Sequence, residues 1–283
     1  MQVLILPDAT AGVSDSPCVS EKQKFRGSIP QGVSLGGVSL GSMNGPHFVA
    51  VTGLAFEARI VAGPGVTVVC GGGQIHFRRS LEAAIRKGCF GVLSFGIAGG
   101  LAPHLKAGAC VVAHSIIAEN VRYASDSGWS QSLIEAVQGR AARFAAPEDV
   151  LLGDIAGTDV PIVCPHAKRR LYEKTGAVAV DMESHVAARI AVEHRVPFAA
   201  FRVITDPSHR ALPPAALVAT NVDGRLDFQA ITRSLIQHPE QVPTLFRLAL
   251  DSWAARRSLI PSRRLLGPHL GLPDLRQHLL DVA

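Results

Sequence analysis

The stretch AVAVDMESHVAARIAVEH, residues 177–194, decides the fold because it joins a strand directly to a helix. Its first four residues form a continuous apolar run, which is typical of a strand covered on both faces. From Glu183 onward the apolar residues follow the period of a helix. Two carboxylates, Asp181 and Glu183, flank Met182 where the strand meets the helix. The stretch therefore predicts α/β architecture with a polar site at the strand end.

Similar apolar runs recur from residue 47 onward, and helical patterns lie between several of them. The clearest helical pattern is 77–88, because it ends in a glycine of the kind that terminates helices. This alternation predicts a three-layer α/β/α sandwich around a mostly parallel, mixed central sheet. The predicted strands are 48–53, 66–70, 91–96, 109–117, 177–180 and 198–205, and the other predicted helices are 132–145, 183–194 and 239–259.

The chain divides into three segments by composition. Residues 1–46 are rich in Gly and Ser and contain the near-repeat GVSLGGVSLG, so we expect a disordered or artificial extension, with Met43 as an alternative start. Residues 47–260 are expected to form a single domain. Residues 261–283 are predicted to be a basic tail. Either the tail and the apolar helix before it touch a membrane surface, or the helix packs on the domain and the tail is a frayed end.

Composition narrows the class of protein. The net charge of +5 favours anionic ligands, but the modest excess and the lack of aromatic residues among the basic ones argue against nucleic acid. Five scattered cysteines without a C-x-x-C pair, together with a poor signal sequence, predict a reduced, cytoplasmic setting. The histidines show no metal-binding spacing, so no metal is predicted.

The three residues of the strand–helix junction each have two open interpretations. Asp181 either caps the helix or belongs to the site. Glu183 either accepts hydrogen bonds from neighbouring hydroxyls, such as a ribose diol, or is a first-turn acid favoured by the helix dipole. Met182 either lies against a sugar face or fills the core.

Three further strand ends carry candidate groups. Asp206 ends the strand 198–205 and is either a turn residue or a general acid kept protonated by burial. The glycines of SFGIAGGL, Gly96 and Gly99 among them, allow the backbone to approach a ligand. After the Gly53 turn, Arg59 is either an anion clamp or a solvated charge.

Four motifs in order, GLAFEAR, FGIAGGL, VDMES and FRVITD, resemble the nucleoside phosphorylase and nucleosidase superfamily over residues 47–220. Within that superfamily they look most like the hopanoid-associated phosphorylase branch, which is understood to remove adenine from adenosylhopane. The resemblance implies a small-molecule nucleoside substrate, with or without a lipid group, and a homodimer. It also implies that Glu183 binds the ribose diol with Met182 packed on the sugar, and that Asp206 protonates N7 of the purine. The implied base pocket contains Gly99, Val160, Pro161 and Ile162.

The resemblance leaves the nucleophile open. Glu57 is the only acid in the first turn, and a one-residue shift places Ala58 where hydrolases carry the acid that activates water. Arg59 instead matches the region where phosphorylases hold phosphate, although Ile97 replaces a hydroxyl residue that often assists there. We therefore expect phosphorolysis, with inorganic phosphate as co-substrate and no other cofactor. Hydrolysis of methylthioadenosine or S-adenosylhomocysteine, and binding without turnover, are the alternatives. The other phosphate contacts would be Gly53, Ser94 and Gly96.

Overall fold

The computed structural model describes residues 3–5, 47–71, 73–141, 149–219, 221, 224–225 and 227–272. The strands are β1 (Val3–Ile5), β2 (Phe48–Thr52), β3 (Val66–Cys70), β4 (Gly91–Gly100), β5 (Cys110–Ala118), β6 (Val121–Ala124), β7 (Val150–Gly157), β8 (Ala179–Asp181) and β9 (Phe198–Asp206). The helices are α1 (Ala55–Val61), α2 (Gly73–Arg86), α3 (Ser127–Ala141), α4 (Pro165–Thr175), α5 (Ser184–Glu193), α6 (Pro214–Leu217), α7 (Phe228–Gln237), the short 3-10 helix η2 (Pro239–Gln241) and α8 (Val242–Leu265).

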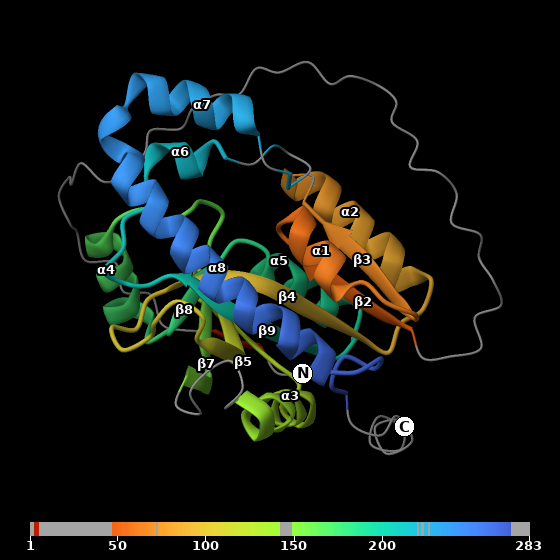
Figure 1. Cartoon of the computed structure of the whole chain (residues 1–283). Coiled ribbons are helices and arrows are strands. Elements are labelled where there is room, and N and C mark those ends of the chain that lie inside the picture. The colour runs from red at the N-terminus through yellow and green to blue at the C-terminus, as the bar shows by residue number, and fades with distance from the viewer. Residues whose placement is uncertain are drawn as a thin grey trace.

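The strands form one mixed sheet, as predicted, in the order β1-β6-β5-β7-β8-β4-β2-β3, and β9 pairs with both β4 and β5. Strands β2, β3, β4 and β9 pair parallel to one another. Strands β5, β7 and β8 form a second parallel group, and the two groups meet antiparallel where β4 pairs with β8 and where β5 pairs with β9. Strand β9 therefore lies at the centre of the sheet (Figure 1).

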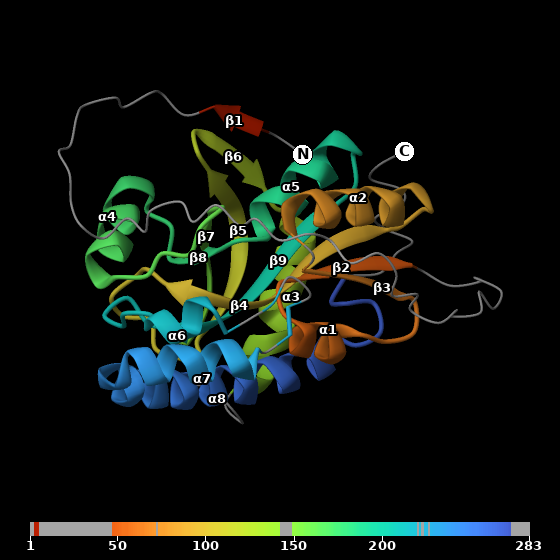
Figure 2. The ribbon, with the colours of Figure 1, turned by 90° about the horizontal axis from the view of Figure 1, so that it is seen from above.

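Helices cover both faces of this sheet, which gives the predicted three layers (Figure 2). Val49 and Val51 of β2 belong to a core cluster that includes residues of α2 and α5. Phe48 and Ala50, which alternate with them, belong to a second cluster on the opposite face, together with Trp129 of α3 and residues of α8. Burial on both faces explains why the strand sequences are continuously apolar instead of alternating.

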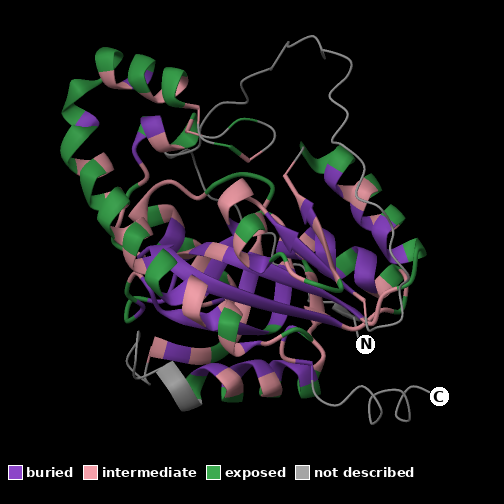
Figure 3. Ribbon diagram, turned by 45° about the vertical axis from the view of Figure 1, so that its right-hand side comes forward, coloured by how far each residue is buried: buried purple, intermediate pink, exposed green. Residues whose placement is uncertain are grey.

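Figure 3 shows this arrangement as a buried sheet between partly exposed helices, with α7 and the first half of α8 largely exposed. Exposed apolar side chains on these two helices include Phe228, Phe246 and Trp253. Within the described ranges, no helix combines the length and the apolar composition that a membrane crossing requires.

The C-terminal part of the chain corrects the domain boundary expected at residue 260. Helix α8 continues through Pro261, and three leucines beyond it, Leu266, Leu270 and Leu272, are buried in the core, with Leu270 at 0% exposure. The indole N–H of Trp129 also donates a hydrogen bond to the Leu270 carbonyl at 2.9 Å. The predicted basic tail therefore belongs to the domain up to residue 272, because its leucines pack into the core. Residues 273–283 lie outside the described residues.

The expectation of an N-terminal extension also falls mostly outside the described residues. Of residues 1–46, only β1 is described, and it pairs antiparallel with β6.

We expect Leu270→Ala to lower the free energy of unfolding by about 2–5 kcal/mol, because the substitution opens a cavity beside Trp129. The matched control is Leu250→Ala on α8, where the side chain is 53% exposed and the expected change is within about 0.5 kcal/mol. Chemical denaturation of both variants measures the difference. Equal effects would show that the segment after residue 260 does not contribute to the core.

Candidate active site

A buried arginine, Arg202, organises the first half of the site. It lies in the middle of β9, whose nine residues are all buried, and its side chain has no exposed surface. The guanidinium pairs with the carboxylate of Asp181 and lies 3.6 Å from Glu183. Although burial acts to lower it, the carboxylates of Asp181, Glu183 and Glu57 hold the pKa of Arg202 above its ordinary value. A buried charge needs such partners because desolvation is otherwise too costly.

The hydroxyl groups of Ser94 and Ser184 also bind the guanidinium of Arg202. Arg202 Nη2 donates to Ser94 Oγ at 2.7 Å and to Ser184 Oγ at 3.1 Å, and the Ser184 hydroxyl donates to Ser94 at 2.9 Å. Ser94 is fully buried. The structure therefore corrects the expectation that Ser94 contacts phosphate, because its hydroxyl is engaged beneath the guanidinium.

Glu57 occupies a point where backbone donors converge. The N–H groups of Gly53 and Leu54 donate to its Oε2 at 3.0 and 2.8 Å, and the N–H of Ile97 donates to its Oε1 at 2.7 Å. Converging backbone N–H groups of this kind form an anion-binding nest, and here the anion is the side chain of Glu57 itself. Burial raises the pKa of Glu57, while Arg202 and these three donors oppose the rise.

Gly53 and Gly96 are required for this packing. A Cβ at Gly53 would lie 2.5 Å from Glu183 Oε1, and a Cβ at Gly96 would lie 2.5 Å from Glu57 Oε1 and 2.7 Å from Arg202 Nη1. All three distances are shorter than real Cβ atoms show. These glycines make room for the carboxylates, which is a different role from the predicted contact with phosphate.

The structure also corrects the prediction of Arg59 as the phosphate clamp. Arg59 is exposed on α1, whereas Glu57, two residues earlier, is buried. Residues two positions apart on a helix point to different sides, so only one of the two can face the cluster. The cation of the cluster is Arg202.

The three residues of the strand–helix junction, Asp181, Met182 and Glu183, have different surroundings in the structure. The backbone N–H of Ser184, at the start of α5, donates to Asp181 Oδ2 at 3.2 Å, which is the capping role foreseen for this aspartate. Glu183 keeps 25% of its side chain exposed, and burial, together with the carboxylates of Asp181 and Glu57, raises its pKa to about 7 against the effect of Arg202. Met182 is 40% exposed, so it does not fill the core.

Asp206 and Lys168 form a second buried charge pair at the end of β9. The Lys168 ammonium, which α4 carries into the interior, donates to Asp206 Oδ2 at 2.6 Å and to the carbonyls of Asp206 and Pro207 at 2.9 and 3.1 Å. Burial raises the pKa of Asp206, and the ammonium group counteracts part of that rise. Gly99 lies beside the pair, where a Cβ would be 3.1 Å from Asp206 Oδ2.

Both charge centres are carried by β9, and an irregularity in its pairing with β4 lies between them, where Ile204 pairs with Ala98 and Asp206 pairs with Gly99. Arg202 and Asp206 are four residues apart on β9, which corresponds to about 13 Å along an extended strand. Asp181 lies beside Arg202 and not beside Asp206. This is because β8 runs antiparallel to β4, so the end of β8 points back along the sheet toward Arg202. The sequence predicts the two acid sites at the ends of neighbouring strands. A separation of about 13 Å along the strand is comparable to the length of a nucleoside.

The segment expected to line the base pocket lies beside β8. The backbone N–H of Thr158 donates to the Asp181 carbonyl at 2.9 Å, which ties the segment to the junction. Ile162 packs on a small cluster that includes Val180, whereas Val160 is 62% exposed and Pro161 is also exposed.

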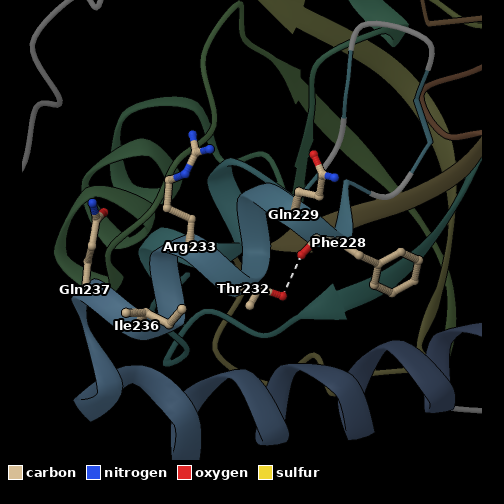
Figure 4. Close-up of a pocket in the computed structure, with 6 residues that line it drawn as sticks. All are labelled: Phe228, Gln229, Thr232, Arg233, Ile236 and Gln237. Atoms are coloured by element: carbon tan, nitrogen blue, oxygen red, sulfur yellow. Dashed lines mark hydrogen bonds between the residues drawn. The ribbon is translucent and has the colours of Figure 1, made fainter.

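A surface hollow lies away from these charges. Its volume is about 660 Å³, and Figure 4 shows it on α7. None of the predicted site residues lines it, and its walls come from Phe228, Gln229, Thr232, Arg233, Ile236 and Gln237. The described residues contain no group of His, Cys, Asp and Glu side chains suited to a metal ion.

Sequence reasoning missed three residues of the site: Arg202, Lys168 and Ser184. Arg202 carried a usable signal, because a single arginine inside a strand that is otherwise apolar must be buried with partners. Lys168 carried none, since it is one of several basic residues in HAKRRLYEK.

The chain belongs to the Phosphorylase superfamily, whose family model matches residues 36–237, more than two thirds of the sequence. No curated protein matches the sequence significantly. The family and the fold make the protein an enzyme of the nucleoside phosphorylase and nucleosidase class.

Several solved structures share the fold at low sequence identity. One is a 5'-methylthioadenosine/S-adenosylhomocysteine nucleosidase from Colwellia psychrerythraea in complex with adenine, with 14% identity, a TM-score of 0.54, and coverage of 78% of this chain and 95% of that one. A mutant of the corresponding nucleosidase from Helicobacter pylori, with 5'-methylthioadenosine in its active site, has 14% identity, a TM-score of 0.53, and coverage of 84% and 100%. Futalosine hydrolase from Helicobacter pylori has 14% identity, a TM-score of 0.51, and coverage of 84% and 98%.

We expect Arg202→Met to lower the free energy of unfolding by about 3–5 kcal/mol at pH 8, because it leaves buried carboxylates without their counter-ion. Loss of the cation raises the carboxyl pKa values, so protonation relieves the repulsion and the deficit should shrink at pH 5. Chemical unfolding at the two pH values measures both effects.

The matched control is Arg78→Met, which removes exposed ion pairs with Glu82 and Glu193 and should cost at most about 1 kcal/mol. A deficit for Arg202→Met that does not depend on pH would contradict the electrostatic role of the cluster.

Proposed function

We propose that this enzyme cleaves the N-glycosidic bond of an adenosine-type nucleoside with water as the nucleophile and releases adenine. The observation that carries the proposal is the position of Glu57. Its carboxylate fills the backbone nest beside Arg202, where a phosphorylase would need room for a phosphate ion. The other support is Asp206, which lies four residues further along β9, about 13 Å along an extended strand.

The leaving purine is protonated by Asp206 in this proposal. Burial raises the pKa of Asp206, which favours the protonated acid that the step requires. As the C1′–N9 bond breaks, its electron pair moves to the purine and the Asp206 proton moves to N7, which leaves neutral adenine. A positioned proton donor of this kind contributes about 10²–10⁴ in rate.

The sugar is held by Glu183, whose carboxylate accepts hydrogen bonds from the ribose 2′- and 3′-hydroxyls. Because the transition state resembles an oxocarbenium ion, a nearby negative charge also stabilises the developing positive charge. Met182, which is exposed next to Glu183, packs on the sugar face. The base lies between Gly99 and the segment that contains Val160, Pro161 and Ile162.

The water attacks C1′ and gives one proton to Glu57. A raised pKa makes Glu57 a better proton acceptor, and Arg202 supplies the donors that orient the water. Within the described part of the chain, Nε and Nη1 of Arg202 are buried without a hydrogen-bond partner. The products are adenine and a ribose with a 1′-hydroxyl, and solvent then carries the proton from Glu57 back to Asp206.

Phosphorolysis is the second candidate, because the two free donor groups of Arg202 would also suit a phosphate oxygen. It was the reaction favoured by the sequence, but Arg59, which carried that interpretation, faces solvent. A phosphate dianion bound to Arg202 would also lie close to the carboxylates of Glu57 and Glu183, and neighbouring like charges repel.

The 5′ substituent is proposed to be a lipid, as in the adenosylhopane of the branch that the sequence resembles. The segment before α7 supports this proposal, since the Gly224 carbonyl accepts a hydrogen bond from Ala55 at 2.9 Å and therefore lies over the Gly53 turn. Exposed apolar side chains flank that segment: Leu217, Val218 and Phe228. A homodimer, contact with a membrane surface and a cytoplasmic location stay predictions.

We expect adenine to be released at the same rate in phosphate-free buffer and in buffer with phosphate, and the other product to be a reducing sugar. Adenosylhopane and methylthioadenosine should be compared, with adenine followed by chromatography. A strict requirement for phosphate, with a sugar 1-phosphate as product, would replace hydrolysis by phosphorolysis. A preference for methylthioadenosine would contradict the lipid substrate, and no adenine from either would contradict the proposed function.

We expect Glu57→Gln to lower kcat for adenine release at least about 100-fold, because an amide cannot accept the proton of water. The control is Glu82→Gln on α2, whose carboxylate pairs with Arg78 and Arg86 on the helix surface, and its kcat should be unchanged. Steady-state kinetics measure both. Wild-type turnover by Glu57→Gln would exclude Glu57 as the base.

A further inference from the structure

Lys168 has no role in the reaction as proposed so far, yet it is the most deeply buried lysine in the described residues, with no exposed side-chain surface. Its ammonium group makes three hydrogen bonds, and all of them go to Asp206 or to the next residue, Pro207. Three donors and three acceptors at 2.6–3.1 Å satisfy the ammonium group completely. Burying a lysine in this way is costly, so a purely structural link between α4 and β9 would be better served by apolar residues.

The contacts leave one carboxyl oxygen of Asp206 available. Lys168 binds Oδ2 and Gly99 makes room on that same side. No other side chain among the described residues hydrogen-bonds to this carboxyl group, whose further donor is the backbone N–H of Asp206 itself. The Asp206 side chain keeps 8% of its surface exposed, whereas that of Lys168 is closed off. We infer that Lys168 is a positioning residue: it binds one carboxyl oxygen of Asp206 and thereby orients the other oxygen toward the leaving base. This inference rests on the proposed function, in which Asp206 is the acid.

The same pair sets the pH range over which Asp206 carries a proton. Two other charged groups belong to this environment: Asp251 on α8, which acts to raise the pKa of Asp206, and Arg210, which pairs with Asp251 at 2.9 Å. The neighbouring positions on β4 and β8 are Gly99 and Val180, which carry no charge. Lys168 is therefore the cation that contacts the carboxyl directly, and it favours the ionised form.

The test is the pH profile of kcat for adenine release by Lys168→Met. The acid must be protonated to act, so kcat falls as the pH rises through the pKa of Asp206. Removing the adjacent cation raises that pKa, so the alkaline limb should move to higher pH by about one unit or more. At the optimum, kcat should fall about 10–100-fold because the acid is no longer held in place, while KM changes less than threefold. Lys174→Met on the exposed side of the same helix is the control and should behave as wild type.

A double-mutant cycle separates positioning from folding. Lys168→Met in the background of Asp206→Asn leaves no unpaired charge, so this variant retains the fold even if the single variant does not. If Lys168 acts through Asp206, the second substitution should change kcat less than twofold in that background. An additive loss of kcat, or an alkaline limb that does not move, would overturn the inference. Wild-type enzyme that releases no adenine would instead overturn the proposed function.

Discussion

The site depends on one buried guanidinium. Arg202 lies at the centre of a sheet that helices cover on both faces, where an unpaired charge would not be tolerated. It is stable there because it gathers three carboxylates that come from α1, β8 and the start of α5. Segments far apart in the sequence are thereby brought to one point, and the acids that a sugar-binding site needs are held close together by the cation between them.

The charge pattern along β9 gives the site its polarity. The Arg202 end is rich in carboxylates with raised pKa values, which suits a reaction in which the sugar becomes positive. The Asp206 end combines a carboxyl group with the Lys168 ammonium, which suits a departing base that gains negative charge. Because one strand carries both ends, the spacing between them is fixed by backbone geometry and not by loops.

The sequence was a good guide to elements and a weaker guide to side-chain direction. Continuous apolar runs identified most central strands, because burial on both faces leaves a pattern that can be read locally. The sequence could not show that Glu57 faces the cluster while Arg59 faces solvent, since both lie in one short helix turn. The position of Lys168 was likewise hidden, as nothing in a basic helix marks the residue that points inward.

By itself, the sequence determined the layered α/β fold and the presence of acids at strand ends, because hydrophobic period and turn residues act over a few neighbouring positions. The tertiary structure alone decided which charges meet. Pairing of Arg202 with Asp181 requires β8 to run antiparallel to β4, and pairing of Lys168 with Asp206 requires α4 to pack over the end of β9. These contacts join residues about 20 and 38 positions apart, and only long-range packing fixes such distances.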